Sequence, residues 1–414
     1  MKIAFMLYDS PNNFCGPTIN ARRLLPELQK RGHDVHAMIL FHGEYASTKD
    51  YFQSLGIRCH IISRPQIIES QITWILKQLQ QINPDIFFAN NVLSAWYASK
   101  WIQKAGIPAI AAHRSDDPYY WGMVRQFVVG LPDWSVAGLI CVSEEIKQKI
   151  ENFQPKSTQL CVIPSGVPVP KIVPTKTDYY LKIAYVGRLV ERQKRIRDTL
   201  EALIKVAKTF PKIKITLFGE GKERPYLEKQ VKQADLNQVI HFAGGVPSEE
   251  LHQQLAQYHV LVLLSDYEGT PGAVMDGMGC GLVPICTDIP GGVQELVIPH
   301  QTGFLVRDRT EDFQKAIQTL YENSELRIQL SKNAREHIIN KYSLLATVNQ
   351  WESFLQKLLK EAPQRSSIRI PWKYNLPPIR EELKAEDHRF SSLWKQGIQK
   401  INLIKDKIKS KILF

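Results

Sequence analysis

The feature that most constrains this chain of 414 residues is a pattern that occurs twice: short apolar runs alternate with segments of helical periodicity. In the first half, strands are predicted at residues 2–7, 35–41, 86–89, 108–112, 138–142 and 160–163. In the second half, strands are predicted at residues 182–186, 214–218, 239–242, 260–264, 283–286 and 304–306. Strands that alternate with helices are typical of parallel βαβ units, with helices on both faces of the sheet. The chain is therefore expected to form two doubly wound α/β domains.

The boundary between the two domains is predicted at a cluster of prolines within residues 164–177. Proline at this density stops helices and weakens strand pairing, so the segment is interpreted as a linker. The expected units are residues 1–170 and 180–345, followed by a crossover helix at 346–361 and a tail at 362–414. Ligands of open parallel sheets bind beyond the carboxyl ends of the strands, so two facing sheets predict an interdomain cleft.

The composition indicates which partners and which cellular compartment suit the protein. The formal net charge is +12, which favours anionic partners such as nucleotides, lipid head groups or nucleic acid. None of the six cysteines forms a C-x-x-C pair, and their scatter fits a reducing compartment better than a disulfide framework. Residues 1–7 run directly into a predicted strand without a signal-peptide pattern, and no stretch is apolar enough to span a bilayer. A cytoplasmic location is expected.

The first candidate site follows the predicted strand at residues 260–264. Thr270 is a suitable N-cap and Pro271 a suitable first residue for a helix at about 271–280. The amides of the loop would then point toward a helix N-terminus, which is a favourable place for a diphosphate. The expected donor-binding segment comprises Gly269, Thr270, Pro271, Gly272 and Ala273. Pro271 has no backbone N–H, so the other four residues would supply the amides.

Two carboxylates belong to the same segment. Glu268 lies in the predicted loop and Asp276 one to two turns into the predicted helix. Carboxylates accept hydrogen bonds from sugar and ribose hydroxyls, so one helix start could hold phosphate, sugar and ribose together. From the residues alone, the alternative is a capped helix with two solvated acids, and this alternative stays open.

A second candidate site follows the predicted strand at residues 182–186. Gly187 and Arg188 come directly after the strand, and Lys194 lies six residues beyond Arg188. Fixed cations at this position would stabilise the charge that develops on a leaving nucleoside diphosphate. The alternative is a solvated basic surface loop.

Taken in order, these segments resemble a known family. The motifs are Val186-Gly187-Arg188-Leu189, Phe218-Gly219-Glu220-Gly221, Phe242-Ala243-Gly244-Gly245-Val246, Ser265-x-x-Glu268-Gly269, Gly281-Leu282-Val283-Pro284, Gly291-Gly292-x-x-Glu295 and Thr302-Gly303-Phe304-Leu305-Val306. In the first half, Ala111-Ala112-His113 ends a predicted strand and Val162-Ile163-Pro164-Ser165-Gly166-Val167 closes the domain. The chain resembles the retaining glycosyltransferases of group 1 (family 4). That resemblance implies the GT-B fold, in which two Rossmann-like domains, one on the acceptor side and one for the donor, face a cleft.

The resemblance also implies roles in the donor domain. Arg188 and Lys194 would neutralise the diphosphate of the donor, and Glu268 would contact its sugar. The amides of residues 270–273 would hold sugar and phosphate, and Asp276 would bind the ribose hydroxyls. In this family the second acid is usually glutamate, with seven residues between the two acids. Asp276 keeps the charge but is one methylene shorter.

Further roles are implied around the mouth of the cleft. His113 would meet the donor sugar from the first domain, and the loop at Gly16 would close over the phosphates and the acceptor. Residues near Gly244 and Val246 would line the base. The sequence Cys15-Gly16-Pro17 departs from the two glycines that are common in this loop. The resemblance therefore predicts the donor and acceptor contacts of that loop less precisely than those of the other segments.

The implied activity is a hexosyltransferase-type transfer from a UDP- or GDP-sugar to a saccharide or lipid-linked acceptor, in polysaccharide or glycolipid biosynthesis. No cofactor and no metal are expected, because there is neither an Asp-x-Asp pair at a strand end nor a zinc-ligand spacing. Two alternatives stay open: a nucleotide-sugar 2-epimerase of the same fold, and a non-catalytic sugar-nucleotide-binding protein. Nucleic-acid binding would explain the charge but not the motifs, so no nucleic-acid partner is expected.

The last segment, residues 392–414, has its own pattern. Its apolar residues recur at helical spacing among six lysines and one aspartate, a net charge of +5. Basic amphipathic helices lie on anionic membranes, where each basic residue contributes up to about 1 kcal/mol. A peripheral contact with an anionic membrane surface is expected, on the inner face of the cell membrane. The alternatives are a helix packed on the body of the protein and a disordered tail.

Overall fold

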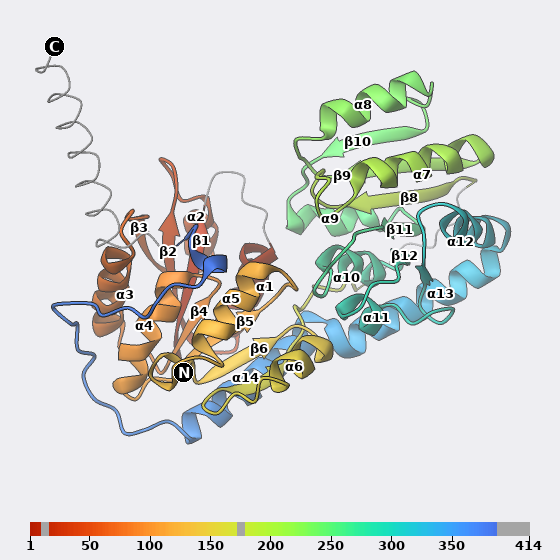
Figure 1. Cartoon of the computed structure of the whole chain (residues 1–414). Coiled ribbons are helices and arrows are strands. Elements are labelled where there is room, and N and C mark those ends of the chain that lie inside the picture. The colour runs from red at the N-terminus through yellow and green to blue at the C-terminus, as the bar shows by residue number, and fades with distance from the viewer. Residues whose placement is uncertain (10–15, 172–178, 387–414) are drawn as a thin grey trace, which may run out of the picture.

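A computed structural model describes residues 1–9, 16–171 and 179–386, and shows two α/β domains (Figure 1). The first domain contains a seven-stranded sheet in the order β3-β2-β1-β4-β5-β6-β7, and the second a six-stranded sheet in the order β10-β9-β8-β11-β12-β13. All neighbouring strands in both sheets are parallel. The prediction of two doubly wound α/β domains is confirmed.

The elements of the first domain follow the predicted alternation. Its strands are β1 (Lys2–Asp9), β2 (Asp34–Phe41), β3 (Arg58–Ser63), β4 (Ile86–Asn90), β5 (Ala109–His113), β6 (Gly138–Cys141) and β7 (Gln159–Val162). Its helices are α1 (Gly16–Lys30), α2 (Ser47–Ser54), α3 (Ile68–Ile82), α4 (Leu93–Lys104), α5 (Pro118–Phe127) and α6 (Glu144–Glu151), with a 3-10 turn at Pro132–Trp134. Strand β3 is not among the predicted strands, because it is an edge strand without a continuous apolar run.

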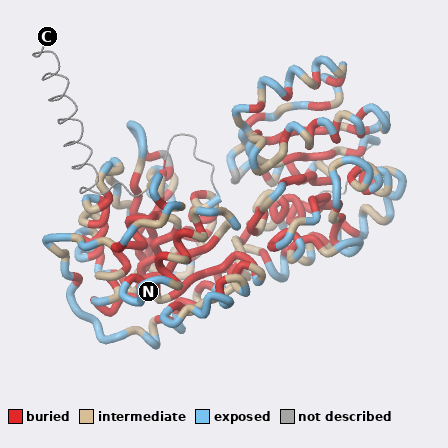
Figure 2. Tube along the Cα trace, in the orientation of Figure 1, coloured by how far each residue is buried: buried red, intermediate tan, exposed pale blue. Residues whose placement is uncertain are grey.

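The second domain repeats the pattern. Its strands are β8 (Leu181–Val186), β9 (Ile213–Phe218), β10 (Ile240–Gly244), β11 (Val260–Leu263), β12 (Val283–Thr287) and β13 (Phe304–Val306). Its helices are α7 (Ile196–Thr209), α8 (Arg224–Gln233), α9 (Ser248–Leu255), α10 (Gly272–Gly279), α11 (Gly292–Leu296), α12 (Glu311–Glu322) and α13 (Ser324–His337). The central strands are buried on both faces, as apolar runs in a parallel sheet require (Figure 2).

The chain then returns to the first domain through a π-helical turn, Ile338–Tyr342, and helix α14 (Leu344–Lys360). Ser343 caps α14, because its side chain accepts a hydrogen bond from the amide of Ala346. The apolar face of α14 packs under the first sheet, where Trp351 meets Phe88 edge-on with ring centroids 4.9 Å apart. Helix α14 is the element expected at residues 346–361, and it ties the two domains together (Figure 1).

Beyond α14, residues 363–386 form a C-terminal strap that lies on the first domain. Ile368 and Leu383 of the strap are buried in that domain's core. The amide of Ser366 donates to the carbonyl of Ala105 at 3.0 Å, and Gln80 donates to the carbonyl of Ile368 at 2.8 Å. The sequence had assigned this stretch to the tail, because its apolar residues lie between prolines without periodicity. The basic segment 392–414 lies outside the described residues.

Among the described residues, no helix combines the length and apolarity needed to cross a membrane.

Candidate functional site

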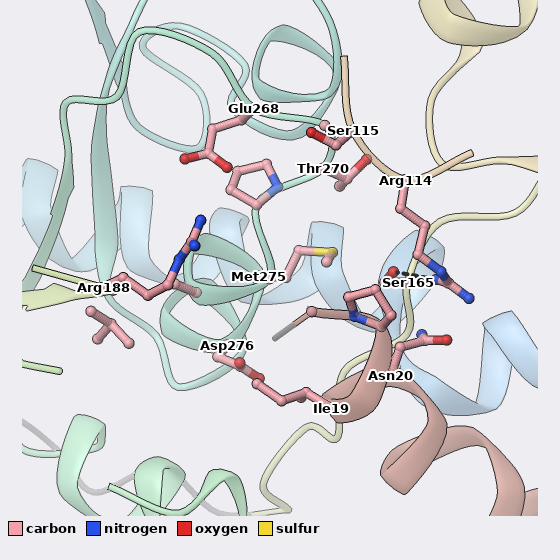
Figure 3. Close-up of a pocket in the computed structure, with 18 of the residues that line it drawn as sticks. Ile19, Asn20, Arg114, Ser115, Ser165, Arg188, Glu268, Thr270, Met275 and Asp276 are labelled. Atoms are coloured by element: carbon pink, nitrogen blue, oxygen red, sulfur yellow. Dashed lines mark hydrogen bonds between the residues drawn. The ribbon is translucent and has the colours of Figure 1, made fainter. Parts of the chain in front are cut away.

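A cleft of about 900 Å³ lies between the two domains, beyond the carboxyl ends of the strands of both sheets (Figure 3). From the second domain it is lined by Val186, Gly187, Arg188, Gln193, Lys194, Phe218, Gly219, Glu220, Gly221, Gly245, Val246, Leu251, Tyr267, Glu268, Gly269, Thr270, Pro271, Gly272, Ala273, Met275 and Asp276. From the first domain it is lined by Gly16, Pro17, Ile19, Asn20, Arg23, Asn91, Arg114, Ser115, Asp117, Tyr120, Ser165 and Gly166. The structure therefore brings both predicted sites into one cavity.

Helix α10 begins at the bottom of this cleft, one residue later than predicted. Its N-cap position is Pro271, and no side chain caps the helix start. Thr270, the predicted N-cap, instead donates its hydroxyl to the carbonyl of Val142 in the first domain at 2.7 Å. The N-cap prediction for Thr270 is therefore wrong, because an interdomain acceptor takes its hydroxyl. The amides of Gly272 and Ala273 are left at the cleft wall, where a helix start favours an anion.

The basic loop after β8 reaches the acidic loop after β11. Lys194 Nζ lies 2.5 Å from Glu268 Oε1, and both side chains are largely buried. Gln193 donates to the carbonyl of Tyr267 at 3.1 Å and accepts from Arg188 at 2.9 Å. A network of hydrogen bonds thus holds two cations and Glu268 beside the start of α10. Arg188 remains exposed to the cleft (Figure 3).

Glycines let these loops approach one another. A Cβ atom on Gly219, whose φ is +141°, would lie 1.9 Å from the carbonyl oxygen of Gly187. The amide of Gly219 also donates to the carbonyl of Gly244 at 2.7 Å. Gly187 therefore lines the cleft as expected, and so does Val246, whereas Gly244 is buried just behind the wall. The glycines of the basic-loop region serve close packing of backbone against backbone.

Asp276 lies in the cleft wall, but both of its oxygens have partners. Oδ2 lies 2.9 Å from Arg23 of α1, and Oδ1 lies 2.8 Å from Nε2 of His252 in α9. Burial alone would raise the pKa of Asp276, but the charges and hydrogen bonds of Arg23 and His252 outweigh burial and hold that pKa below its usual value. The residue expected to bind ribose is thus the centre of an interdomain ion pair in this structure.

Gly16 was predicted at the cleft, but Ile19, Asn20 and Arg23 of the same helix α1 were not. Gly16, Ile19, Asn20 and Arg23 all line the cleft, and their spacing of three, four and seven residues places them on one face of the helix. That spacing was the available signal. Arg114 was also missed. It follows His113 directly and donates to Ser165 across the cleft wall at 3.4 Å (Figure 3).

His113 differs from its expected place. It ends β5 but does not appear in the cleft lining, although Arg114 and Ser115 do. Its imidazole packs against Trp121 and Tyr120, with ring centroids 4.8 Å and 5.3 Å away. Burial lowers the pKa of His113 to about 3, with Lys149 adding to the shift and Asp116 opposing it. The imidazole is therefore neutral at physiological pH, behind the cleft wall.

No group of three or more His, Cys, Asp or Glu side chains that could hold a metal ion occurs within residues 1–9, 16–171 and 179–386.

Comparison with known families covers both domains. Residues 172–337 match the model of "Glycosyl transferases group 1", and residues 16–170 match that of "Glycosyltransferase Family 4". A glycogen synthase of Mycobacterium tuberculosis is 27% identical over 232 residues, which are 53% of this chain and 56% of that protein. A lipopolysaccharide 1,6-galactosyltransferase of Escherichia coli is 24% identical over 333 residues, which are 74% of this chain and 84% of that protein.

Solved structures agree on the fold. HepE of Anabaena, solved with UDP-glucose, superposes with a TM-score of 0.68 at 15% identity and covers 86% of this chain and all of that one. The pneumococcal O-GlcNAc transferase GtfA, solved with UDP and GlcNAc, gives a TM-score of 0.71 at 12% identity, covering 87% of this chain and 99% of that one. With the two family models covering more than half of the chain between them, this protein belongs to the group 1 glycosyltransferases and has the GT-B fold.

The Arg23–Asp276 pair makes a prediction for acid stability. A carboxylate with a lowered native pKa stabilises the fold at neutral pH, and this contribution is lost as the pH falls below about 3.9 toward the native value. Asp276→Asn should lower the free energy of unfolding at pH 7 by at least about 1 kcal/mol. It should also reduce the loss of unfolding free energy that acid causes, the acid limb of the plot of that free energy against pH. Denaturant unfolding at a series of pH values from neutral to acid measures it.

The matched control is Glu201→Gln on α7, which removes an exposed ion pair with Lys205 of the same length, 2.9 Å. Exposed pairs contribute about 0.2–1 kcal/mol, so the control should change stability little and leave the acid limb unchanged. Equal stability and equal acid limbs for the wild type and Asp276→Asn would contradict the ion-pair assignment.

Proposed function

We propose that this protein transfers a hexose from a UDP- or GDP-sugar to a saccharide or lipid-linked acceptor, with retention of anomeric configuration and without a bound metal. The observation that carries the proposal is the arrangement of Arg188, Lys194 and Glu268 around the uncapped start of α10. Positive charge for a diphosphate and a carboxylate for sugar hydroxyls lie together in one interdomain cleft.

In the proposed reaction, the diphosphate rests on the amides at the start of α10. The bond between the anomeric carbon and the β-phosphate oxygen breaks, and negative charge grows on the departing nucleoside diphosphate. Arg188 and Lys194 stabilise that charge in place of a metal ion. The acceptor hydroxyl attacks from the face that the diphosphate leaves, and its proton passes to a β-phosphate oxygen. The new glycosidic bond therefore has the configuration of the donor.

The remaining parts of the donor have places in the same cleft. Glu268 and Gly269 lie where the sugar meets both domains, and Gly245 with Val246 provides an apolar edge for the base. The side chain of Asp276 is one methylene shorter than the glutamate that is usual in this family, and it already forms an ion pair with Arg23. Ribose hydroxyls that bind Asp276 must therefore replace Arg23 or His252, or bind beside them. His113, neutral behind the cleft wall, supports the wall from the first domain.

The relatives support this proposal by what they bind and do. HepE was solved with UDP-glucose, and GtfA with UDP and GlcNAc. The Escherichia coli relative, which matches 74% of this chain, is a lipopolysaccharide 1,6-galactosyltransferase. These likenesses support the proposed role in polysaccharide or glycolipid biosynthesis. A non-catalytic sugar-nucleotide-binding protein is the second candidate, favoured by the occupied carboxylate of Asp276.

Substitutions in the basic loop test the proposal. Arg188→Ala and Lys194→Ala should each reduce turnover about 100-fold or more, because each removes a charge that the leaving diphosphate needs. They should also reduce the rise in melting temperature that UDP- or GDP-sugars cause in the wild type. A panel of nucleotide sugars, followed by thermal shift and by release of the nucleoside diphosphate, provides both readouts.

Arg192→Ala is the matched control, since Arg192 lies in the same loop, is exposed and does not line the cleft. It should keep wild-type turnover and thermal shift. Unchanged turnover in both cleft variants would contradict the charge-stabilising role. Stabilisation by a nucleotide sugar without any turnover, across the acceptor panel, would favour the non-catalytic candidate.

We further propose that the basic segment 392–414 binds an anionic membrane surface, which would place the protein at the inner face of the cell membrane. The net charge of +5 and the helical spacing of its apolar residues support this proposal. The last described residue before it, Glu386, pairs with Arg64 at 2.5 Å. Arg64 in turn lies over the ring of Tyr8 in β1, with its Cζ 4.6 Å from the ring centroid. The described part of the strap therefore ends on the acceptor-side domain.

Truncation tests the membrane proposal, and the structure decides where to truncate. A stop after Glu386 keeps Ile368 and Leu383 in the core, whereas a stop after Ala362 would remove both. The full chain should sediment with vesicles that contain phosphatidylglycerol and not with phosphatidylcholine vesicles alone, and the shortened chain with neither. Equal sedimentation of both chains with the anionic vesicles would contradict the proposal.

A further inference from the structure

A second hollow, with a volume of about 660 Å³, lies on the first domain outside the cleft. It is formed by the start of α5, the end of α6 and the strap. Its lining combines two aromatic rings, Trp121 and Phe153, with charged and amide side chains. The hollow is broad and open to solvent, unlike the enclosed pockets that bury most of a small ligand. Nothing in the proposed donor reaction uses this hollow.

The hollow and the cleft share one wall, the segment of residues 114–121. Within this segment, the cleft is lined by Arg114, Ser115, Asp117 and Tyr120, whereas the hollow is lined by Asp116, Pro118 and Trp121. Neighbouring residues of a single stretch of chain thus contribute to both cavities. A ligand that extends out of the cleft over this wall reaches the hollow directly.

The aromatic rings of the hollow are accessible and set at an angle. The centroids of Trp121 and Phe153 lie 6.3 Å apart with their planes at 58°, and Phe153 is 44% exposed. An aromatic face attracts the weakly positive C–H groups of a pyranose ring, as it attracts other positive edges. Carboxylate, amide and ammonium groups beside it bind hydroxyls. Asp116, Asn152 and Lys149 provide one group of each kind.

The polar groups of the hollow are held in place by one another. Trp121 donates its indole N–H to Asp116 Oδ1 at 2.5 Å, and Asp116 Oδ2 pairs with Lys149 at 3.0 Å. On the far side, Arg125 pairs with Glu382 of the strap at 2.6 Å. These contacts fix the indole ring. Lys149 also pairs with Glu145 at 2.9 Å, which leaves one of its three N–H donors, and the oxygens of Asp116 can each accept a further hydrogen bond. A fixed ring with adjacent polar groups is preorganised for a ligand.

We propose that this hollow is a saccharide subsite that binds the outer sugars of an acceptor chain, while the end of that chain occupies the cleft. The proposal rests on the proposed transferase function and narrows its acceptor to a saccharide of more than one sugar. A protein loop would also find polar partners here. The position of the hollow across one wall from the acceptor side of the cleft favours the continuation of the acceptor itself.

A binding experiment without any nucleotide sugar tests the subsite separately from the transfer reaction. The probes are linear glucose, galactose and N-acetylglucosamine oligomers, from monosaccharide to hexasaccharide, measured against the full chain by calorimetric titration. The wild type should bind at least one series with an affinity that rises with chain length. Phe153→Ala should weaken binding of the longest member about tenfold, because it removes one of the two rings.

Tyr226→Ala is the matched control, since Tyr226 is also a surface aromatic, 42% exposed, and lies on α8 of the other domain. It should bind like the wild type, and the melting temperature of Phe153→Ala should stay unchanged, because Phe153 is exposed. Affinity that does not rise with chain length in any series would overturn the subsite, and so would Phe153→Ala binding the longest oligomer as the wild type does. Neither result touches nucleotide-sugar binding, which the thermal-shift panel measures.

Discussion

The site depends on a place where the two domains touch backbone to backbone, at Gly269. A Cβ atom at this residue would lie 2.3 Å from the carbonyl oxygen of Arg114 in the first domain, so no larger residue fits without moving a domain. The next residue, Thr270, donates its hydroxyl to Val142 across the same boundary. The loop that carries Glu268 is therefore fixed from both sides. Together with helix α14 and the Arg23–Asp276 ion pair, this contact joins the two domains beside the cleft.

A second consequence concerns charge. Both acids of the donor segment are neutralised by cations in this structure: Glu268 by Lys194 within the second domain, and Asp276 by Arg23 across the cleft. Buried carboxylates without such partners would be costly. A nucleotide sugar brings its own negative charge and its own hydroxyl donors. When the nucleotide sugar binds, the cations must therefore exchange their carboxylate partners for its phosphates, and the carboxylates must exchange their cations for its hydroxyls. In this account, the interdomain pair links donor binding to the relative position of the domains.

The sequence predicted the parallel sheets because buried strands appear as continuous apolar runs, and it placed the loops of Glu268 and Lys194 because both follow such strands. The contact between the two loops was not predicted, and it arises because the strands that precede them, β8 and β11, are neighbours in the sheet. Three features were not predictable in this way. The hydroxyl of Thr270 donates to a carbonyl of the other domain, which the local sequence does not indicate. The imidazole of His113 packs against Trp121 behind the cleft wall. Arg23 comes from a helix 253 residues away from its partner Asp276.

The most direct test of the account is amide hydrogen exchange with and without UDP- or GDP-sugar. One bound donor should slow exchange in two separate segments at once, the basic loop 187–194 and residues 269–276, which include the start of α10. Helix α12 (Glu311–Glu322), which lies apart from the cleft lining, should not change. Slower exchange in both segments and not in α12 is the predicted result. A nucleotide sugar that stabilises the protein without protecting these two segments would contradict the placement of the donor site.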